Sequence, residues 1–120
     1  MYNDLQNKHH KGELGKIKSV SVGYGGYQNC LFGVSFNFES GWWEASDFIS
    51  AGWYNDIKPN KRSAWTEADR SADKITFCDT LQQIMNDAKV TKVEELNGKP
   101  VRVFFQDGCL KTWEILTEVL

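Results

Sequence analysis

The pattern of apolar and polar residues predicts two paired strands in the first third of the chain. Residues 16–24 alternate imperfectly and residues 30–38 alternate more regularly. The pair Gly25-Gly26 lies between the two runs, and such a pair between alternating segments is a standard hairpin signal. Residues 42–49 then predict a third strand, or a strand that runs into a short turn.

Helical spacing predicts one long helix over residues 67–89. Thr66 and Asp69 resemble a capping box at its N-terminus. Apolar residues recur every three or four positions and the acidic residues fall mostly off that face. The apolar positions are Phe77, Leu81, Ile84, Met85 and Ala88. This face is expected to pack on a core, and it contains no cofactor motif.

Turn signals predict a second hairpin after the helix. Asn97-Gly98 marks a turn, residues 101–105 and 110–116 are strand-like, and Asp107-Gly108 between them is a strong two-residue hairpin signal. The order ββ(β)-loop-α-ββ predicts an α+β fold. We expect an antiparallel sheet of about four to six strands with one main helix on a face.

The first fifteen residues are polar and predict a flexible N-terminal tail, which leaves residues 16–120 as a single α+β domain. His9-His10 in this segment could bind a metal, but no carboxylate or cysteine ligand set accompanies the pair. We therefore interpret the segment as an arm without a metal site. The polar N-terminus also shows no signal peptide.

Composition excludes several classes of function. The net charge is −2 and no basic block occurs, which argues against binding duplex nucleic acid. No apolar run approaches the ~18 residues of a membrane span. The three cysteines, Cys30, Cys78 and Cys109, form no CxxC motif, which favours reduced, buried thiols in a cytosol. Five Trp, seven Phe and four Tyr exceed what a small core hides, so some aromatics are expected to face a ligand or partner.

Catalytic signatures are missing from the sequence. The only histidines lie in the expected tail, and GxSxG, Walker A and HExxH do not occur. The glycine stretch runs into a strand, whereas a dinucleotide fingerprint requires a helix there. We therefore expect no enzyme activity, no catalytic residues, no metal and no cofactor.

Two aromatic segments leave a choice of interpretation. The stretch from Val22 to Gln28 contains Tyr24 and Tyr27 beside three glycines, and it is either a plain turn or a ring-stacking platform beside backbone N–H groups that hold an anion. Residues 51–63 predict a loop. Trp53 and Tyr54 in it are either an anchor to the core or a lid over a ligand.

Three segments together resemble the first-described Thoeris anti-defence family of bacteriophages. They are residues 16–28, with Gly23-Tyr24-Gly25-Gly26-Tyr27-Gln28, residues 96–101, Leu-Asn-Gly-Lys-Pro-Val, and residues 110–120, which begin Leu-Lys-Thr-Trp-Glu-Ile. These small phage proteins sequester cyclic nucleotide signals of bacterial immunity. The resemblance covers about two-fifths of the chain.

The resemblance implies a homodimer that can assemble further into a hexamer in the host bacterial cytoplasm. It implies that cyclic ADP-ribose isomers bind near the dimer interface and are released intact; some members of the family also hold cyclic oligonucleotides at separate sites between dimers. By position, Tyr27 resembles the base-stacking aromatic and Asn97 the polar turn residue at the ligand, while Thr117 and Gln28 fall near the second site. The ligand-binding candidates are Gly25, Gly26, Tyr27, Gln28, Asn97, Arg102, Trp113, Glu114 and Thr117.

One residue departs from the family pattern. Relatives commonly carry an arginine after the tryptophan, whereas this chain has Glu114. A carboxylate facing a pyrophosphate would repel it. Either Glu114 points elsewhere, Arg102 or Arg62 supplies the positive charge, or the ligand differs.

Three functional hypotheses remain open. The leading one is a phage anti-defence protein that binds and sequesters cyclic nucleotides without cleaving them. The alternative is a protein-binding inhibitor of a bacterial defence complex, acting through a tryptophan-rich surface of Trp42, Trp43, Trp53 and Tyr54. A nuclease or cyclase-type enzyme is third, and the missing metal cluster argues against it.

Overall fold

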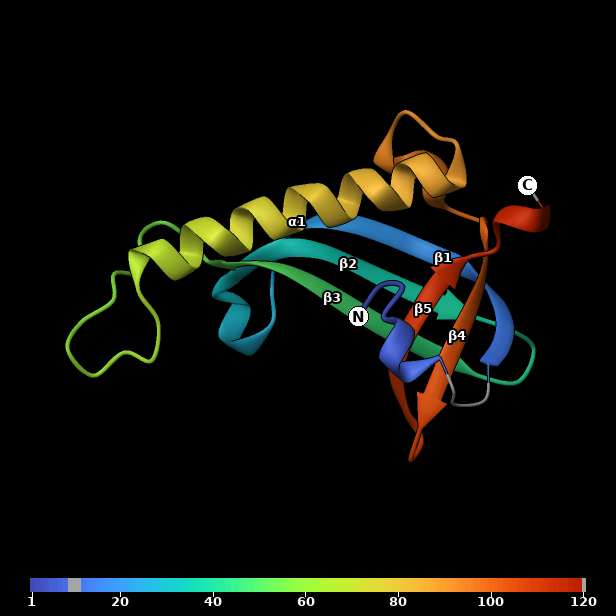
Figure 1. Ribbon diagram of the computed structural model, residues 1–120, viewed down its shortest axis with the longest axis horizontal. Helices are drawn as coiled ribbons and strands as arrows, with labels where there is room; N and C mark the ends of the chain where they lie inside the picture. Colours follow the sequence, from blue (N-terminus) through green and yellow to red (C-terminus); the bar gives the residue numbers. More distant parts are fainter. Residues whose placement is uncertain (9–11, 120) are drawn as a thin grey trace.

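Five antiparallel strands form one sheet in the order β3-β2-β1-β4-β5 in the computed structural model, which describes residues 1–8 and 12–119 (Figure 1). One long helix, α1, lies over one face of this sheet. The predicted α+β fold is confirmed. The elements are β1 (Gly12–Gly25), β2 (Leu31–Glu39), β3 (Glu44–Trp53), α1 (Glu67–Ala88), β4 (Pro100–Gln106) and β5 (Cys109–Ile115), with short 3₁₀ helices η1 (Leu5–Asn7), η2 (Tyr27–Asn29), η3 (Val93–Leu96) and η4 (Thr117–Val119).

Strand β1 joins two halves of the sheet. Its first residues, 12–16, pair with β4, and residues 16–25 pair with β2. A register shift between Ile17 and Ser19 marks the change of partner. Such a shift bends a strand and increases its twist. The sheet therefore curls, and β4 and β5 run across the direction of β2 and β3 (Figure 1).

The core lies inside this curl. Phe36 and Phe38 on β2 pack against Trp113 on β5, with ring centroids 4.9 and 4.7 Å apart, and all three side chains are fully buried. The indole Nε1–H of Trp113 donates to Oδ2 of Asp47 on β3 at 2.8 Å. Burying an indole requires such a partner for its N–H. Trp113 therefore connects the two outermost strands of the sheet.

Helix α1 begins and ends as its sequence predicts. The Thr66 hydroxyl accepts from the backbone N–H of Asp69, the Asp69 carboxylate accepts from the N–H of Thr66, and Lys89 adopts a left-handed conformation at the C-terminus. Arg70, Phe77 and Ile84 recur every seven residues on the buried stripe. The helix packs mainly on β3. Phe77 in the middle of α1 contacts Phe32 near the start of β2, with ring centroids 6.2 Å apart, which places this part of the helix beside the start of β2.

The N-terminal segment corrects the expectation of a flexible tail over residues 1–15. Residues 12–15 belong to β1, where they pair with β4. Met1–Asn3 lies along β5: Asn3 N–H donates to Trp113 O at 2.7 Å, and the ring of Tyr2 packs on that of Trp113 at 4.6 Å. Pairing with β4 and β5 therefore orders a segment whose own sequence pattern predicts no regular structure. His9-His10 lie outside the described residues.

The boundaries of β3 also differ from the sequence prediction. Trp42 and Trp43 lie in the turn before β3, whereas residues 51–53, expected in a loop, complete the strand. Pairing of Leu31 with Trp53 extends β3 beyond its own alternation pattern. The Asp107-Gly108 turn is confirmed, and both residues have positive φ, 54° and 77°.

Candidate functional site

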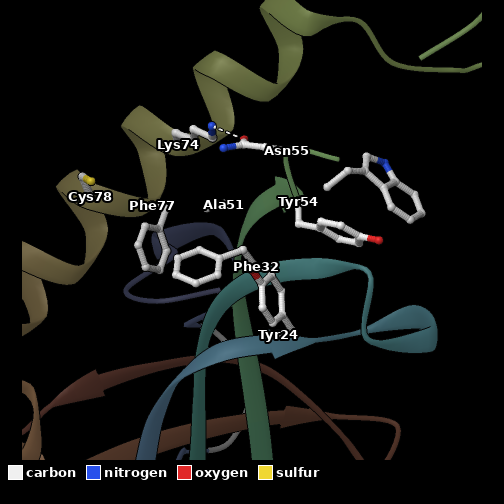
Figure 2. Close-up of a pocket in the computed structure, with 9 residues that line it drawn as sticks. Tyr24, Phe32, Ala51, Tyr54, Asn55, Lys74, Phe77 and Cys78 are labelled. Atoms are coloured by element: carbon white, nitrogen blue, oxygen red, sulfur yellow. Dashed lines mark hydrogen bonds between the residues drawn. The ribbon is translucent and has the colours of Figure 1, made fainter. Parts of the chain in front are cut away.

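An aromatic cleft of about 370 Å³ opens between the N-terminal half of α1 and the ends of β1 and β2 (Figure 2). We call it the aromatic cleft throughout. Strands β1, β2 and β3, helix α1 and the segment after β3 build its walls. The residues lining it are Tyr24, Phe32, Ala51, Trp53, Tyr54, Asn55, Lys74, Phe77 and Cys78.

Four rings follow one another across the aromatic cleft. Tyr54 and Tyr24 have centroids 5.6 Å apart, Tyr24 and Phe32 5.6 Å, and Phe32 and Phe77 6.2 Å, all in edge-to-face arrangements (Figure 2). Cross-strand pairing fixes Tyr24 opposite Phe32. Phe77 is buried, but Tyr24 remains 65% exposed. This row of edge-to-face rings therefore runs from a buried phenylalanine to tyrosine rings that a ligand can reach.

The polar groups of the cleft lie at its rim. Lys74 Nζ donates to Oδ1 of Asn55 at 2.7 Å, which holds the ammonium beside the opening (Figure 2). Lys74 is the one charged side chain among the described residues that line the cleft. A smaller adjoining hollow is lined by Tyr24, Asn29, Tyr54 and Asp56. The cleft therefore combines apolar ring faces with one cation and one amide.

Arg70 fixes the segment that carries Tyr54 and Asn55. Its guanidinium is buried, with 4% of the residue exposed. Nη1 donates to the carbonyl oxygens of Tyr54 at 3.0 Å and Ile57 at 2.6 Å. Nη2 donates to the Glu67 carboxylate at 2.6 Å. Rigid, multidentate donation of this kind holds backbone in one place, so Arg70 is a positioning residue for the cleft.

The structure separates the two roles left open for Trp53 and Tyr54. Trp53 stacks on Trp65 at 6.0 Å, and Arg70 lies 5.0 Å from the centre of the Trp65 ring. Trp53 therefore anchors the segment after β3 to the start of α1. Tyr54 instead turns its ring to Tyr24 in the cleft.

The glycine stretch that the sequence singles out forms the turn after β1. Gly26 has φ 67°, and Gln28 follows at φ 51°. Gly26 combines its positive φ with ψ −152°, a backbone conformation that is essentially confined to glycine, so this position requires glycine. Gly25 ends β1, and Tyr27 on η2 is 70% exposed. The candidates Gly25, Gly26, Tyr27 and Gln28 thus lie together at one tip of the molecule.

The remaining five candidates lie around β4 and β5. Asn97 and Thr117 are exposed, and Arg102 and Glu114 are cross-strand partners. Trp113 is fully buried on the opposite face of β5 from Glu114. Trp113 is therefore a core residue in this chain.

Glu114 is held between cations. Arg102 Nη1 lies 3.6 Å from its carboxylate, and Lys8 makes an ion pair and hydrogen bond with it. Arg102 Nη2 also lies 3.8 Å from Glu118. Glu114, the residue that departs from the family pattern, is thus neutralised by Lys8 and Arg102 of the same chain. Arg102 in turn forms ion pairs with two carboxylates, those of Glu114 and Glu118.

The two groups of candidates are far apart in one chain. Gly98 N–H donates to Ile17 O at 2.7 Å, which places Asn97 beside the middle of β1. Ile17 and Gly25 are eight residues apart on that strand, a span of roughly 26 Å at ~3.3 Å per residue, and Tyr27 lies beyond Gly25. One small ligand in one chain therefore cannot contact both groups.

The four aromatics assigned to a tryptophan-rich surface do not form one surface. Trp42 is 95% exposed in the β2–β3 turn, whereas Trp43 packs on Phe105 at 5.3 Å. Trp53 and Tyr54 lie at the other end of β3. Strand β3 lies between the pair Trp42-Trp43 and the pair Trp53-Tyr54. The sequence does not show this separation, because the two pairs are close to each other along the chain.

Other chemistry is sparse. The described residues contain no cluster of three or more histidine, cysteine or acidic side chains placed to hold a metal. No helix in the described ranges is long and apolar enough to cross a membrane. The three cysteines are free, but Cys78 and Cys109 are exposed and Cys30 is half-buried, so the expected burial of all three is wrong.

Sequence reasoning missed Lys74, Asn55 and Arg70. In the sequence, Lys74 cannot be distinguished from other solvent-facing lysines of a helix. Its hydrogen bond to Asn55 depends on the path of the loop between β3 and α1. Arg70 gave one signal: it shares the seven-residue spacing of Phe77 and Ile84 and is therefore on the buried stripe.

Comparison of the chain with known protein families, with curated proteins and with solved structures finds no match.

Proposed function

We propose that this protein is a non-catalytic binding protein that sequesters a small cyclic nucleotide in the aromatic cleft. The observation that carries the proposal is the exposed Tyr24 ring, packed on half-buried Tyr54, with Lys74 at the rim. A base stacked on an aromatic ring gains about 1–3 kcal/mol. An ammonium adds charge-assisted hydrogen bonds to a phosphate. The two chemistries of a nucleotide thus have complementary groups in one place.

The size of the cleft suits part of such a ligand. Its volume of about 370 Å³ lies at the lower end of the ~300–1,000 Å³ of small-molecule sites. A base with its sugar would fill this space. The phosphates would then lie at the rim, where the Lys74 ammonium meets them.

The resemblance to the phage family supplies the biological setting of the proposal. It makes the protein a phage anti-defence protein in the host bacterial cytoplasm, with cyclic ADP-ribose isomers or cyclic oligonucleotides as ligands. Competition with a host receptor requires roughly nanomolar affinity, about −12 kcal/mol. A homodimer, or a hexamer built from it, would close an open cleft further and raise affinity by pre-organisation.

The first experiment identifies the ligand. The purified protein is incubated with mixed cyclic ADP-ribose isomers and cyclic oligonucleotides, washed and heat-denatured, and the released molecules are identified by mass spectrometry. We expect an intact cyclic nucleotide at about one per chain. Release of a cleaved product would show an enzyme, and release of nothing from folded protein would contradict the proposal.

Two tyrosines then locate the site. Tyr24 lines the aromatic cleft, whereas Tyr27 is the residue that the resemblance assigns to stacking. We expect Tyr24→Ala to weaken binding about 5-fold to 150-fold, from a loss of about 1–3 kcal/mol, and Tyr27→Ala to have a smaller effect. Both rings are mostly exposed, at 65% and 70%, so the variants are matched in their effect on folding. The reverse order would move the ligand to the η2 turn.

A protein partner is the second candidate, favoured by one residue. Trp42 is 95% exposed at the tip of the β2–β3 hairpin, and exposed tryptophans are common at interface centres. Stoichiometric capture of a defence protein by the wild type, lost in Trp42→Ala, would favour the inhibitor over the nucleotide-binding protein.

A further inference from the structure

The smaller hollow beside the aromatic cleft shares a wall with it. This adjoining hollow has a volume of about 260 Å³ and is lined by Tyr24, Asn29, Tyr54 and Asp56. Tyr24 and Tyr54 also line the aromatic cleft, and their rings pack edge-to-face with centroids 5.6 Å apart (Figure 2). The volume of the adjoining hollow lies just below the ~300–1,000 Å³ of whole small-molecule sites. It can therefore hold one base of a ligand whose remainder lies in the aromatic cleft.

Backbone contacts fix the position of Asp56. It is a central residue of the turn in which the Ile57 N–H donates to Tyr54 O at 3.0 Å. Buried Arg70 holds both ends of this turn, because its guanidinium donates to the carbonyls of Tyr54 and Ile57. The neighbouring Asn55 lines the aromatic cleft, whereas Asp56 lines the adjoining hollow. One turn thus presents an amide to one hollow and a carboxylate to the other.

Asn29 reaches the same hollow from the turn after β1. Its backbone is left-handed, with φ 56°, and its N–H donates to Gly26 O at 3.3 Å. The carbonyl of the next residue, Cys30, accepts from the N–H of Tyr54 at 3.0 Å. This bond joins the turn after β1 to the segment that carries Asp56. The fold itself therefore brings the two polar side chains to one hollow.

These two side chains have hydrogen-bonding capacity to spare. Within residues 1–8 and 12–119, neither the Asp56 carboxylate nor the Asn29 amide makes a side-chain hydrogen bond or ion pair. A carboxylate accepts through two oxygens, and an amide NH₂ donates. The adjoining hollow can therefore offer one donor, from Asn29, beside two acceptors, from Asp56.

Guanine is the standard base that matches this arrangement. Its Watson–Crick edge presents a carbonyl oxygen followed by two adjacent donors, the ring N–H and the exocyclic amino group. The Asn29 amide can donate to the carbonyl oxygen while the Asp56 carboxylate accepts from both donors. Each other standard base presents a single donor group on this edge, next to an acceptor that a carboxylate repels. The hollow therefore discriminates among bases by hydrogen bonding, in addition to the stacking that every base can make.

We propose that the adjoining hollow is a guanine-specific subsite, with Asp56 and Asn29 as its specificity-determining residues, and that the ligand is a cyclic oligonucleotide that contains guanine. One base lies on each side of the Tyr24–Tyr54 wall. The phosphates lie toward Lys74, because Asp56 repels them from the adjoining hollow. This inference rests on the proposed function and narrows its ligands, since a cyclic ADP-ribose isomer has one base, an adenine, and leaves the adjoining hollow unfilled.

Three cyclic dinucleotides that differ in one base test the subsite. Cyclic GMP–AMP, cyclic IMP–AMP and cyclic di-AMP, all with the same linkages, are titrated into the full chain by isothermal titration calorimetry. Hypoxanthine lacks only the exocyclic amino group of guanine, whereas adenine has an acceptor in place of the ring N–H. We expect cyclic GMP–AMP to bind about 5-fold to 150-fold more tightly than cyclic di-AMP, the range for a good bidentate contact to a base. Cyclic IMP–AMP is expected to lie between the two.

Asp56→Asn separates base specificity from binding as such. Asparagine keeps the shape of the side chain but presents one acceptor and one donor. It therefore opposes the amino group of guanine and matches xanthine, which has a carbonyl oxygen in its place. We expect the variant to lose the preference for cyclic GMP–AMP and to bind cyclic XMP–AMP more tightly than wild type does. Asp56 is exposed, so the substitution is compatible with the fold, and the melting temperature checks this.

Asp107→Asn is the matched control. It makes the same change of charge at an exposed position in the turn between β4 and β5, where φ is 54°, and asparagine tolerates this left-handed backbone. We expect it to leave the affinities for all the cyclic dinucleotides unchanged. A shift equal to that of Asp56→Asn would show an effect of net charge alone and would overturn the subsite.

The outcomes distinguish the subsite from the proposed function. Equal affinities for the three cyclic dinucleotides, weakened alike by Tyr24→Ala, would overturn the guanine subsite and leave nucleotide binding in the aromatic cleft intact. A guanine preference that survives Asp56→Asn would also overturn it, as would a cyclic ADP-ribose isomer that binds at least as tightly as cyclic GMP–AMP. Failure of every cyclic dinucleotide and every cyclic ADP-ribose isomer to bind would contradict the proposed function itself, and the subsite with it.

Discussion

Trp113 and Tyr24 mark two regions of the molecule that use aromatic residues differently. We call β4, β5 and residues 1–8 the closed end, and the aromatic cleft with the η2 turn the open end. At the closed end Trp113 is fully buried and its N–H is bonded to Asp47. At the open end Tyr24 is 65% exposed, and its ring packs edge-to-face on the rings of Phe32 and Tyr54.

The charged residues of the two ends also differ in whether they are paired. At the closed end, Glu114 is paired with Lys8 and Arg102, and Arg102 with Glu118 as well. At the open end, Lys74 contacts a neutral amide. A paired cation gains little from a phosphate, because it would first lose its own partner, whereas an ammonium beside an amide keeps its full charge for an anion. The charges of the closed end therefore pair within the fold, whereas Lys74 at the open end is available to the ligand that we propose.

The largest effect is expected from Trp113→Ala. Removal of a buried tryptophan costs about 3–5 kcal/mol, and it leaves Asp47 without its donor. We expect urea denaturation to show this loss. Trp42→Ala, which removes a 95% exposed ring, is the control, and surface changes of this kind stay within about 0.5 kcal/mol. Similar losses in both variants would contradict the division between core and surface.

The two arginines give the next contrast. Arg70→Ala leaves the Ile57 carbonyl without its Arg70 donor, while the Tyr54 carbonyl keeps the N–H of Ile57 as its other donor. A buried polar group left unpaired costs about 1–3 kcal/mol. We expect lower stability and faster protease cleavage between β3 and α1, together with weaker ligand binding. Arg102→Ala removes a half-exposed side chain whose ion pairs are on the surface, so we expect less than about 1 kcal/mol. Equal protease sensitivity would show that Arg70 does not hold the loop.

Local signals explain why much of the fold could be predicted. The capping box of Thr66 and Asp69, the Asp107-Gly108 turn and the alternation of β2 act within a few residues, so the sequence shows them directly. The bend of β1 and the order of residues 1–8 could not be predicted. They depend on pairing with β4, about ninety residues away in the chain, and with β5, about 110 residues away.

The candidate site was predicted less well, for the same reason. The stretch around Tyr24 was identified, but which tyrosine faces a cleft depends on the pairing of Tyr24 with Phe32. Lys74 and Asn55 meet across the loop after β3, whose backbone is held by Arg70 on α1, and the sequence shows neither contact. The proposed roles of Tyr27 and Asn97 stay predictions.

A smaller effect is expected at alkaline pH from Tyr2. Burial, and then the hydrogen bond to Asp87 at 2.6 Å, raise the pKa of Tyr2 well above its usual value of about 10. The native state therefore keeps a proton that the unfolded chain loses, so stability is fully present below pH ~10 and falls as the pH rises further. We expect wild type to lose more stability than Tyr2→Phe between pH 9 and 11. Parallel losses would show that Tyr2 does not titrate differently on folding.

The smallest effect is expected from Glu114→Gln. The Glu114 side chain is 22% exposed, and its loss leaves Lys8 and Arg102 facing each other. Arg102 keeps Glu118, so we expect a loss of less than about 1 kcal/mol that shrinks further in salt.

Ligand affinity is the sharper measurement on Glu114, because it shows which end of the molecule binds the anion. A ligand in the aromatic cleft is far from β5, so Glu114→Gln and Glu114→Arg should leave its dissociation constant unchanged, while Lys74→Gln should raise it. A tenfold gain in affinity on removing the Glu114 charge, about 1.4 kcal/mol, would place the anion at the closed end. Glu114 would then be a repulsive group in the binding site, and the aromatic cleft would need another explanation.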